Sequence, residues 1–167
     1  MHIPAGGARR KLVLPGDPGW QVLVKTTDEI RKSSATPRRD EDLWFPVMGS
    51  AYYAFRLMAF YHTVSSDAGL AYGLWAPVDT SGNEGPLFDV QSSSLSLGVV
   101  QSLQISFNAS ATNLTNVDAG SSPPLVLKGV FKTLNPGIFE FRWAQRVSAA
   151  VSTLMRAGSR LEYRRVA

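Results

Sequence analysis

The alternation of apolar and polar residues along the chain predicts antiparallel β structure. From Trp20 onward, short apolar segments are separated by clusters of Gly, Pro, Asn, Asp and Ser, a pattern typical of a sandwich or barrel. Over 101–107 and 139–143 the two residue classes alternate with period two, so one face of each strand should lie in the core. We expect strands near residues 20–26, 42–47, 51–63, 68–76, 87–91, 97–107, 124–131, 138–145 and 159–166. Strands of this number and length favour an all-β fold, an antiparallel jelly-roll sandwich.

The expected strand at 51–63 has apolar residues on both faces. Alternation places Tyr53 and Phe55 on one face and Tyr52 and Phe60 on the other. An apolar face on each side predicts that the strand is covered twice, either inside a sandwich beneath a covering arm or at a subunit interface.

The segment 147–157 permits a second interpretation. Val147, Val151, Leu154 and Met155 recur at helical spacing, which would suit an amphipathic helix. The hydroxyl residues between them compete with helix formation, so this interpretation is the weaker one.

Residues 1–19 form a segment of different character, rich in Gly and Pro and without helical or alternating period. It carries a basic triplet, Arg9, Arg10 and Lys11. Such a segment buries too little apolar surface to order itself, so we expect an extended N-terminal arm at 1–19 that lies on another molecule or another copy, and a β domain at 20–167.

Charge is distributed unevenly. Residues 1–40 contain eight Lys/Arg and four acids, residues 41–127 contain one Arg and seven acids, and residues 128–167 contain eight Lys/Arg and two acids. The basic ends should therefore meet a negatively charged partner or the acidic middle of a neighbouring subunit. The arginines near the C-terminus are spread singly between apolar residues, which disfavours direct nucleic-acid binding.

Composition excludes several chemistries. The 167 residues include no Cys and only two His, so disulfides, thiol nucleophiles, iron–sulfur clusters and Cys/His zinc sites are ruled out. No Gly-x-Ser-x-Gly elbow and no phosphate-binding loop is present. No stretch has the form of a signal peptide or a membrane span. These absences remove many enzyme classes from consideration, and we expect no cofactor and no membrane partner.

The carboxylates leave two minor hypotheses. The run Asp40-Glu41-Asp42 could bind a hard cation, but we favour a solvated turn opposite Arg38 and Arg39, because adjacent side chains of a strand alternate faces. A glycosidase pair would need two carboxylates across a groove, with candidates Glu41, Asp67, Asp79, Glu84 and Asp89.

Three stretches of sequence resemble one protein family. The first comprises Lys25-Thr-Thr-Asp-Glu29, Asp42-Leu-Trp-Phe-Pro-Val47 and Tyr53-Ala-Phe-Arg56, and the second is Ala71-Tyr-Gly-Leu-Trp-Ala-Pro77. The third comprises Leu127-Lys-Gly-Val130, Gly137-Ile-Phe-Glu-Phe-Arg-Trp-Ala-Gln145 and Leu154-Met-Arg-Ala-Gly-Ser-Arg-Leu161. Together they resemble tailed-bacteriophage virion proteins with a tumour-necrosis-factor-like jelly roll, over roughly residues 22–166. The chain departs from the family at Arg146-Val-Ser148, where Asn-Thr-Ser is usual.

The resemblance implies a non-enzymatic homotrimer on the virion. The function expected is that of a capsid decoration (cement) protein, which binds the major capsid protein at the outer surface of the head. In this interpretation the arm contacts the capsid through Arg9, Arg10, Lys11, Leu12 and Pro15. Subunit contacts are expected at Tyr52, Phe55, Phe60, Trp143, Gln145 and Arg160. The alternative is a module of a head or tail fibre that binds a host receptor or glycan through loops 77–86 and 108–123.

Overall fold

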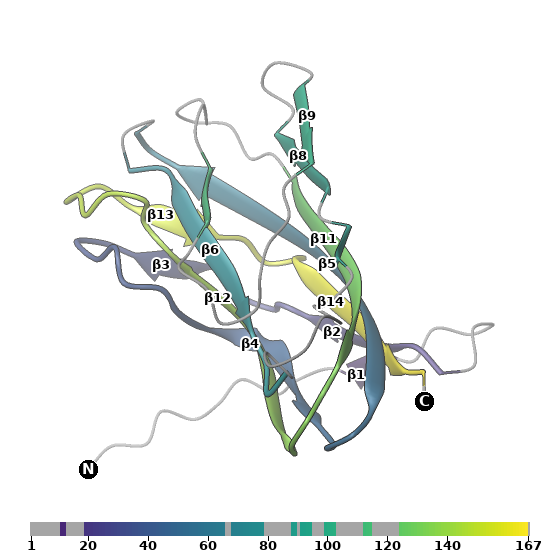
Figure 1. Ribbon diagram of the computed structural model, residues 1–167. Helices are drawn as coiled ribbons and strands as arrows, with labels where there is room; N and C mark the ends of the chain where they lie inside the picture. The colour runs from purple at the N-terminus through teal and green to yellow at the C-terminus, as the bar shows by residue number, and fades with distance from the viewer. Residues whose placement is uncertain are drawn as a thin grey trace, which may run out of the picture.

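The computed structural model describes residues 19–65, 68–78 and 124–166, together with the backbone of short strands at 11–12, 88–89, 91–94, 99–102 and 112–114 (Figure 1). These residues form β1 (Lys11–Leu12), β2 (Gln21–Val24), β3 (Glu29–Arg31), β4 (Arg38–Val47), β5 (Tyr52–Thr63), β6 (Leu70–Trp75), β7 (Phe88–Asp89), β8 (Gln91–Ser94), β9 (Val99–Ser102), β10 (Thr112–Leu114), β11 (Pro124–Lys132), β12 (Gly137–Ala144), β13 (Thr153–Met155) and β14 (Arg160–Arg165).

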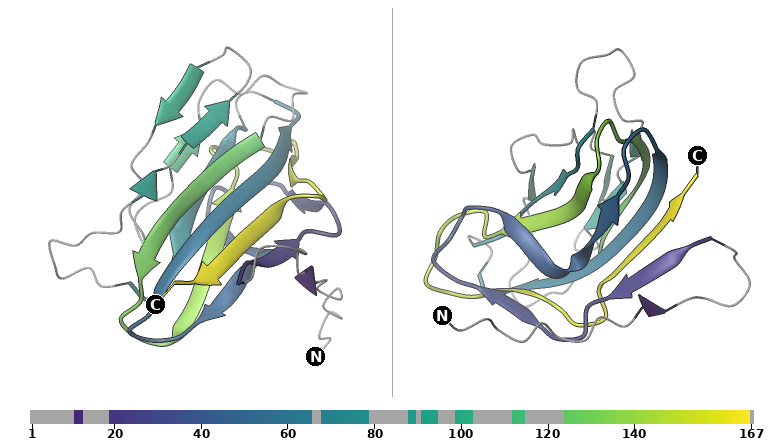
Figure 2. Two further views of the ribbon diagram at one scale, coloured as in Figure 1. Left: turned by 90° about the vertical axis from the view of Figure 1, so that its right-hand side faces the viewer. Right: turned by 90° about the horizontal axis from the view of Figure 1, so that it is seen from below.

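Two antiparallel sheets pack face to face. The large sheet contains the order β2-β14-β5-β11, extended at its edges by β1 and β7, and the small sheet has the order β10-β6-β12-β4. Counted along the chain, the eight strands β2, β4, β5, β6, β10, β11, β12 and β14 are ordered 1-8-3-6 in one sheet and 2-7-4-5 in the other. This is the strand order of a jelly roll, so the predicted fold class is confirmed. Figure 2 shows the two layers edge-on and the large sheet from outside.

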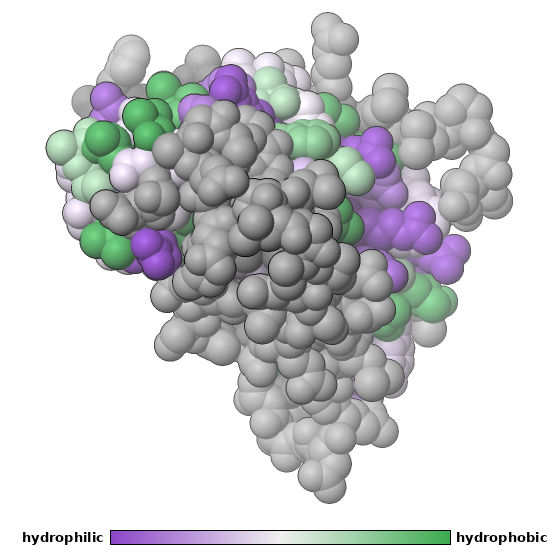
Figure 3. Space-filling view, turned by 90° about the horizontal axis from the view of Figure 1, so that it is seen from above, coloured by the Kyte–Doolittle hydropathy of each residue, from purple (hydrophilic) through white to green (hydrophobic). Residues whose placement is uncertain are grey.

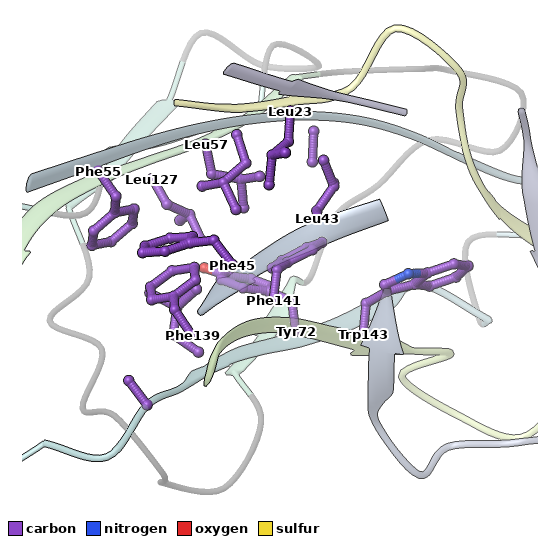
Figure 4. Packing of buried hydrophobic residues seen from close by; sticks show 14 of the residues in the cluster. Leu23, Leu43, Phe45, Phe55, Leu57, Tyr72, Leu127, Phe139, Phe141 and Trp143 are labelled. Carbon is purple, nitrogen blue, oxygen red and sulfur yellow. The ribbon is translucent and has the colours of Figure 1, made fainter. Parts of the chain in front are cut away.

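The core lies between the sheets and is rich in aromatic rings (Figure 4). Phe139 stacks on Phe45 at a centroid distance of 4.8 Å and on Phe131 at 5.4 Å. Phe45 also stacks on Tyr163, at 3.7 Å and nearly parallel. On β5 the odd-numbered residues from Tyr53 to Tyr61, which alternation places on one face, are buried. The even-numbered residues form the outer surface of the large sheet.

The strand predictions hold for β4, β5, β6, β11, β12 and β14, whereas residues 103–107 of the strand expected at 97–107 lie outside the described residues. The structure adds β1, β3, β10 and β13, and it places β8 at 91–94, mostly beyond the strand expected near 87–91. The helix interpretation of 147–157 is wrong, because β13 pairs with β3 on one side and β5 on the other. Thr153 and Met155 are both buried, so the period of that segment is two.

Candidate functional site

Two of the family-like motifs pair with each other at a break in the large sheet. The chain leaves the sheet between β2 and β3 and again between β13 and β14, and these two corners face each other. Lys25 N–H donates to the Ser159 carbonyl at 2.8 Å, and Gly158 N–H donates to the Lys25 carbonyl at 2.9 Å. The Asp28 carboxylate accepts the N–H of Ala157 at 2.8 Å. The Lys-Thr-Thr-Asp and Ala-Gly-Ser stretches therefore close one structural joint. Gly158 suits it, because its φ of +86° lies in the left-handed region.

Lys25 points from this joint into the interior, where it is almost completely buried. Its Nζ lies 2.9 Å from Glu29 Oε2, 3.0 and 3.1 Å from the two oxygens of Asp40, and 3.7 Å from Asp42 Oδ2. A buried ammonium of this kind requires carboxylate partners, because the transfer of an ion from water into a protein interior costs on the order of several kcal/mol. The three carboxylates meet that requirement.

Asp40 is held in the interior by a bulge in β4. The pairing of β12 with β4 shifts register between Glu140 and Arg142, so several residues of β4 lack ladder partners there. Asp40 Oδ1 accepts the N–H of Asp42 and of Leu43 at 3.0 Å each, and Oδ2 accepts Trp143 Nε1–H at 3.0 Å. The solvated-turn interpretation is thus wrong for Asp40, whose carboxylate replaces the missing partners of the bulge.

The charges of the cluster stabilise Lys25 and Glu29, whereas at Asp40 burial outweighs the attraction of Lys25 and raises the pKa of that carboxyl above its ordinary value. Burial alone would lower the pKa of Lys25, but Asp40 and Glu29 outweigh it and hold that pKa above its ordinary value. Burial alone would raise the pKa of Glu29, but hydrogen bonds from Lys25 and Arg31 hold it below its ordinary value. Arg31 also donates to backbone carbonyls, among them that of Trp143.

Gln145, which ends the Trp-Ala-Gln stretch, joins two loops. Its Oε1 accepts the N–H of Ser34 and of Ala149, each at 3.2 Å, and its Nε2 donates to the Val151 carbonyl at 2.7 Å. Gln145 is fully buried. The motif residues at both ends of the resemblance therefore build the fold, and their polar atoms are occupied by other parts of the same chain.

The predicted interface residues separate into two groups. Phe55, Trp143 and Gln145 are buried inside the chain at 1%, 0% and 0% exposure, so they have no surface to offer a second subunit, and this part of the prediction is corrected. Phe55 lies on a strand whose two faces are both apolar, so alternation could not show which of them the other sheet covers. The other three, Tyr52, Phe60 and Arg160, retain outward surface, and a subunit contact there stays a prediction.

The predicted capsid-binding arm falls mainly outside the described residues. Arg9, Arg10 and Pro15 lie outside them, as do most of the receptor loops 77–86 and 108–123. For Lys11 and Leu12 the backbone is described, and it pairs with Leu23 and Val22 of β2 in the same chain.

The outer face of the small sheet carries a row of charges paired within the chain. Trp44, Glu140 and Trp75 lie side by side across β4, β12 and β6. Arg39 stacks over Trp44 at 4.8 Å and Arg142 over Trp75 at 4.7 Å. Both guanidinium groups reach Glu140, at 3.5 and 2.6 Å. We call these five residues the tryptophan–glutamate row.

The outer face of the large sheet has a different charge balance. The register of β5 with β14 and β11 places Arg56 between Glu162 and Lys128, Met58 between Arg160 and Val126, and Ala54 between Arg164 and Val130. We call these nine residues, together with Trp20 beside them, the basic sheet face. It contains four cations and one carboxylate, interleaved with apolar side chains. Figure 2 (left) looks onto this sheet, and in Figure 3 hydrophilic and hydrophobic residues lie interspersed on the side where it runs.

Trp20 organises the centre of the basic sheet face. Its buried indole lies 4.9 Å from the guanidinium carbon of Arg56 and 5.1 Å from that of Arg164. Within the part of the chain that the structure describes, no carboxylate lies within ion-pair distance of either guanidinium, and Arg164 Nε is buried without a hydrogen-bond partner. Two shallow hollows of about 350 Å³ each border Trp20 and Arg56. No sequence pattern reveals this arrangement, because it depends on the register of three strands.

The two carboxylate hypotheses gain little support from the described residues. Of the glycosidase candidates only Glu41 is fully described, and it is exposed. No group of three or more His, Cys, Asp or Glu that could hold a metal occurs among the residues described. Those residues also include no helix long and apolar enough to span a membrane.

Comparison with known proteins adds two distant structural likenesses. No protein-family model and no curated protein matches the chain. Two solved structures from infectious bursal disease virus are similar to it. One is described as the structure of the Gx strain, at 13% identity and a TM-score of 0.43, and the match covers 98% of this chain and 38% of that one. The other is the VP2 subviral particle, at 12% identity and a TM-score of 0.41, covering 99% and 42%. The chain spans about two fifths of their length, and likeness at this level leaves function to be argued from the residues above.

Proposed function

We propose that the protein is a non-enzymatic structural component of a virus particle, and that it decorates the outer surface of a tailed-phage capsid as a homotrimer bound to the major capsid protein. The observation that carries this proposal is the joint formed by Lys25–Asp28 and Ala157–Ser159, together with the buried Lys25–Asp40–Trp143 cluster. The residues of this joint and this cluster come from the stretches whose sequence resembles one family of virion proteins, and in this chain they hold the jelly roll together.

The use of these residues supports a structural role over catalysis. In an enzyme, the most specific motifs usually converge on a cleft and leave polar atoms free for a substrate. Here the polar atoms of Lys25, Asp40 and Gln145 are buried and bonded within the chain. What remains for function is surface, and a rigid sandwich with a charged sheet face suits binding to another protein.

The test is the number of copies of this chain per major capsid protein in purified particles, measured by quantitative mass spectrometry. Hundreds of copies, with a trimer in analytical ultracentrifugation, are expected for a decoration protein. A few tens of copies or fewer, in multiples of three, would instead place the chain in a fibre or tail and favour receptor binding. Absence from particles would refute the proposal.

A further inference from the structure

We propose that the basic sheet face is a docking surface for an acidic surface of a different protein. This step rests on the proposed function, under which that protein is the shell protein that the chain decorates. The recognition chemistry is that of carboxylates bound by arginines, with apolar contact between them.

The charge balance of the face points to an anionic partner. Arg56 and Arg164 stack on Trp20, and stacking on an indole holds a guanidinium in place without neutralising it. The tryptophan–glutamate row of the small sheet uses the same stacking, but there Glu140 neutralises both arginines. In the described part of the chain, only the large sheet presents stacked guanidinium groups with no carboxylate within ion-pair distance.

The spacing of the cations favours a protein over a nucleic acid. Met58, Val126 and Val130 lie between the basic residues, so the charges are separated by apolar surface and do not follow a line. Trp20 is only 9% exposed and lies between two guanidinium groups, so it offers no open ring for base stacking. Arginine beside apolar and aromatic residues is the composition of a protein interface.

Within the described residues, a second copy of the same chain offers this face no acidic surface. A two-fold contact of the face with itself would bring four cations against four cations. Among the described acids, Asp28, Glu29, Asp40, Asp42, Glu140 and Glu162 each lie within 4 Å of a Lys or Arg of their own chain. They leave no cluster of free carboxylates to meet the basic sheet face.

The test measures binding to shells of the major capsid protein purified without this chain. The variant Arg56→Ala/Arg164→Ala removes the two stacked guanidinium groups. Lys32→Ala/Arg38→Ala is the matched control, because it removes the same charge from two exposed residues outside the face. We expect the face variant to bind at least about tenfold more weakly than the unaltered protein, and the control to bind within about twofold. Arg56→Lys/Arg164→Lys should fall between them, because it keeps the charge but loses the planar fork. Thermal unfolding of each variant identifies any loss that comes from misfolding.

The outcomes separate this inference from the proposed function. If the unaltered protein binds shells and the folded face variant binds equally well, the docking surface lies elsewhere, while the proposed function stands. If the unaltered protein does not bind shells, both fail. If the unaltered protein instead binds a double-stranded DNA fragment and the face variant does not, the partner is a nucleic acid and the inference is overturned.

Discussion

Replacing Lys25 by methionine should destabilise the protein strongly. The substitution keeps most of the side-chain volume and removes a cation that is 1% exposed and lies within 3.1 Å of oxygens of both Glu29 and Asp40. It leaves Asp40, which is fully buried, without its counter-ion. Breaking a buried pair from one side typically costs about 3–5 kcal/mol, which is a large part of a domain stability of about 5–15 kcal/mol.

The surroundings of Asp40 place the expected cost near the lower end of that range. Its carboxylate keeps the hydrogen bonds from Trp143 and from the N–H groups of Asp42 and Leu43. We therefore expect Lys25→Met to lower the free energy of unfolding by about 3 kcal/mol. Asp40→Asn should lower the free energy of unfolding by a similar amount, because the N–H groups of the new amide would face the N–H donors that the carboxylate now binds.

The measurement is urea unfolding at pH 7, followed by circular dichroism. Lys132→Met is the control, since Lys132 is exposed on β11, and it should change stability by less than about 0.5 kcal/mol. In the double variant Lys25→Met/Asp40→Asn the cost should be smaller than the sum of the two single costs by about 1.5–3 kcal/mol. A cost below about 1 kcal/mol for Lys25→Met, or strict additivity, would refute the claim that the cluster acts as one unit.

Three further predictions concern single residues. Gly73→Ala should cost about 1–3 kcal/mol, because a Cβ there would lie 2.5 Å from the Trp75 ring, and thermal unfolding measures the loss. Tyr61→Phe should leave stability at pH 7 unchanged or higher, since the Tyr61 hydroxyl is buried without a partner. Burial also raises the pKa of Tyr61 to about 12, so the folded state keeps a proton that the unfolded chain loses above about pH 10. Stability should therefore fall as pH rises from about 10 to 12, and fall less in Tyr61→Phe, as urea unfolding across that range would show. Gln145→Leu should speed amide hydrogen exchange at Ser34 and Ala149, whose N–H groups it leaves without an acceptor, and unchanged rates would contradict the joining role of that side chain.

Much of the fold follows from alternation along the sequence. Period two over 139–143 identifies the buried face of β12, because a strand that packs on one side must place its apolar residues there. Over 51–63 alternation separates the two faces of β5, but both are apolar, so it does not identify the buried one. Three of the strands that were missed, β3, β10 and β13, have three residues each and are too short for a period. The place of β3 and β13 is determined by pairing with each other and with β5, and that of β10 by pairing with β6.

The candidate site could be predicted only in part. The basic ends of the chain indicate an anionic partner, but Arg56 comes from the acidic middle and reaches Arg164 through the pairing of β5 with β14. The Lys25 cluster was harder to predict, because Asp40 and Trp143 are separated by 103 residues. Side chains that meet across such a distance depend on strand order, which a pattern within one segment does not contain.

The two outer faces of the sandwich differ in how far their stacked arginines are neutralised by carboxylates. On the small sheet each stacked arginine also contacts Glu140, so the charge of that face is largely cancelled at short range. On the large sheet the stacked arginines keep their charge, and the Glu162 carboxylate pairs with Arg160 at 3.4 Å. An acidic shell would therefore attract the molecule by one face and orient it before contact, as electrostatic complementarity does in other protein complexes. Because the attraction is screened within about 8–10 Å at physiological salt, raising the ionic strength should slow association more than it speeds dissociation. Stopped-flow binding to shells at several salt concentrations measures both rates, and a salt effect confined to dissociation would show that the face does not steer the encounter.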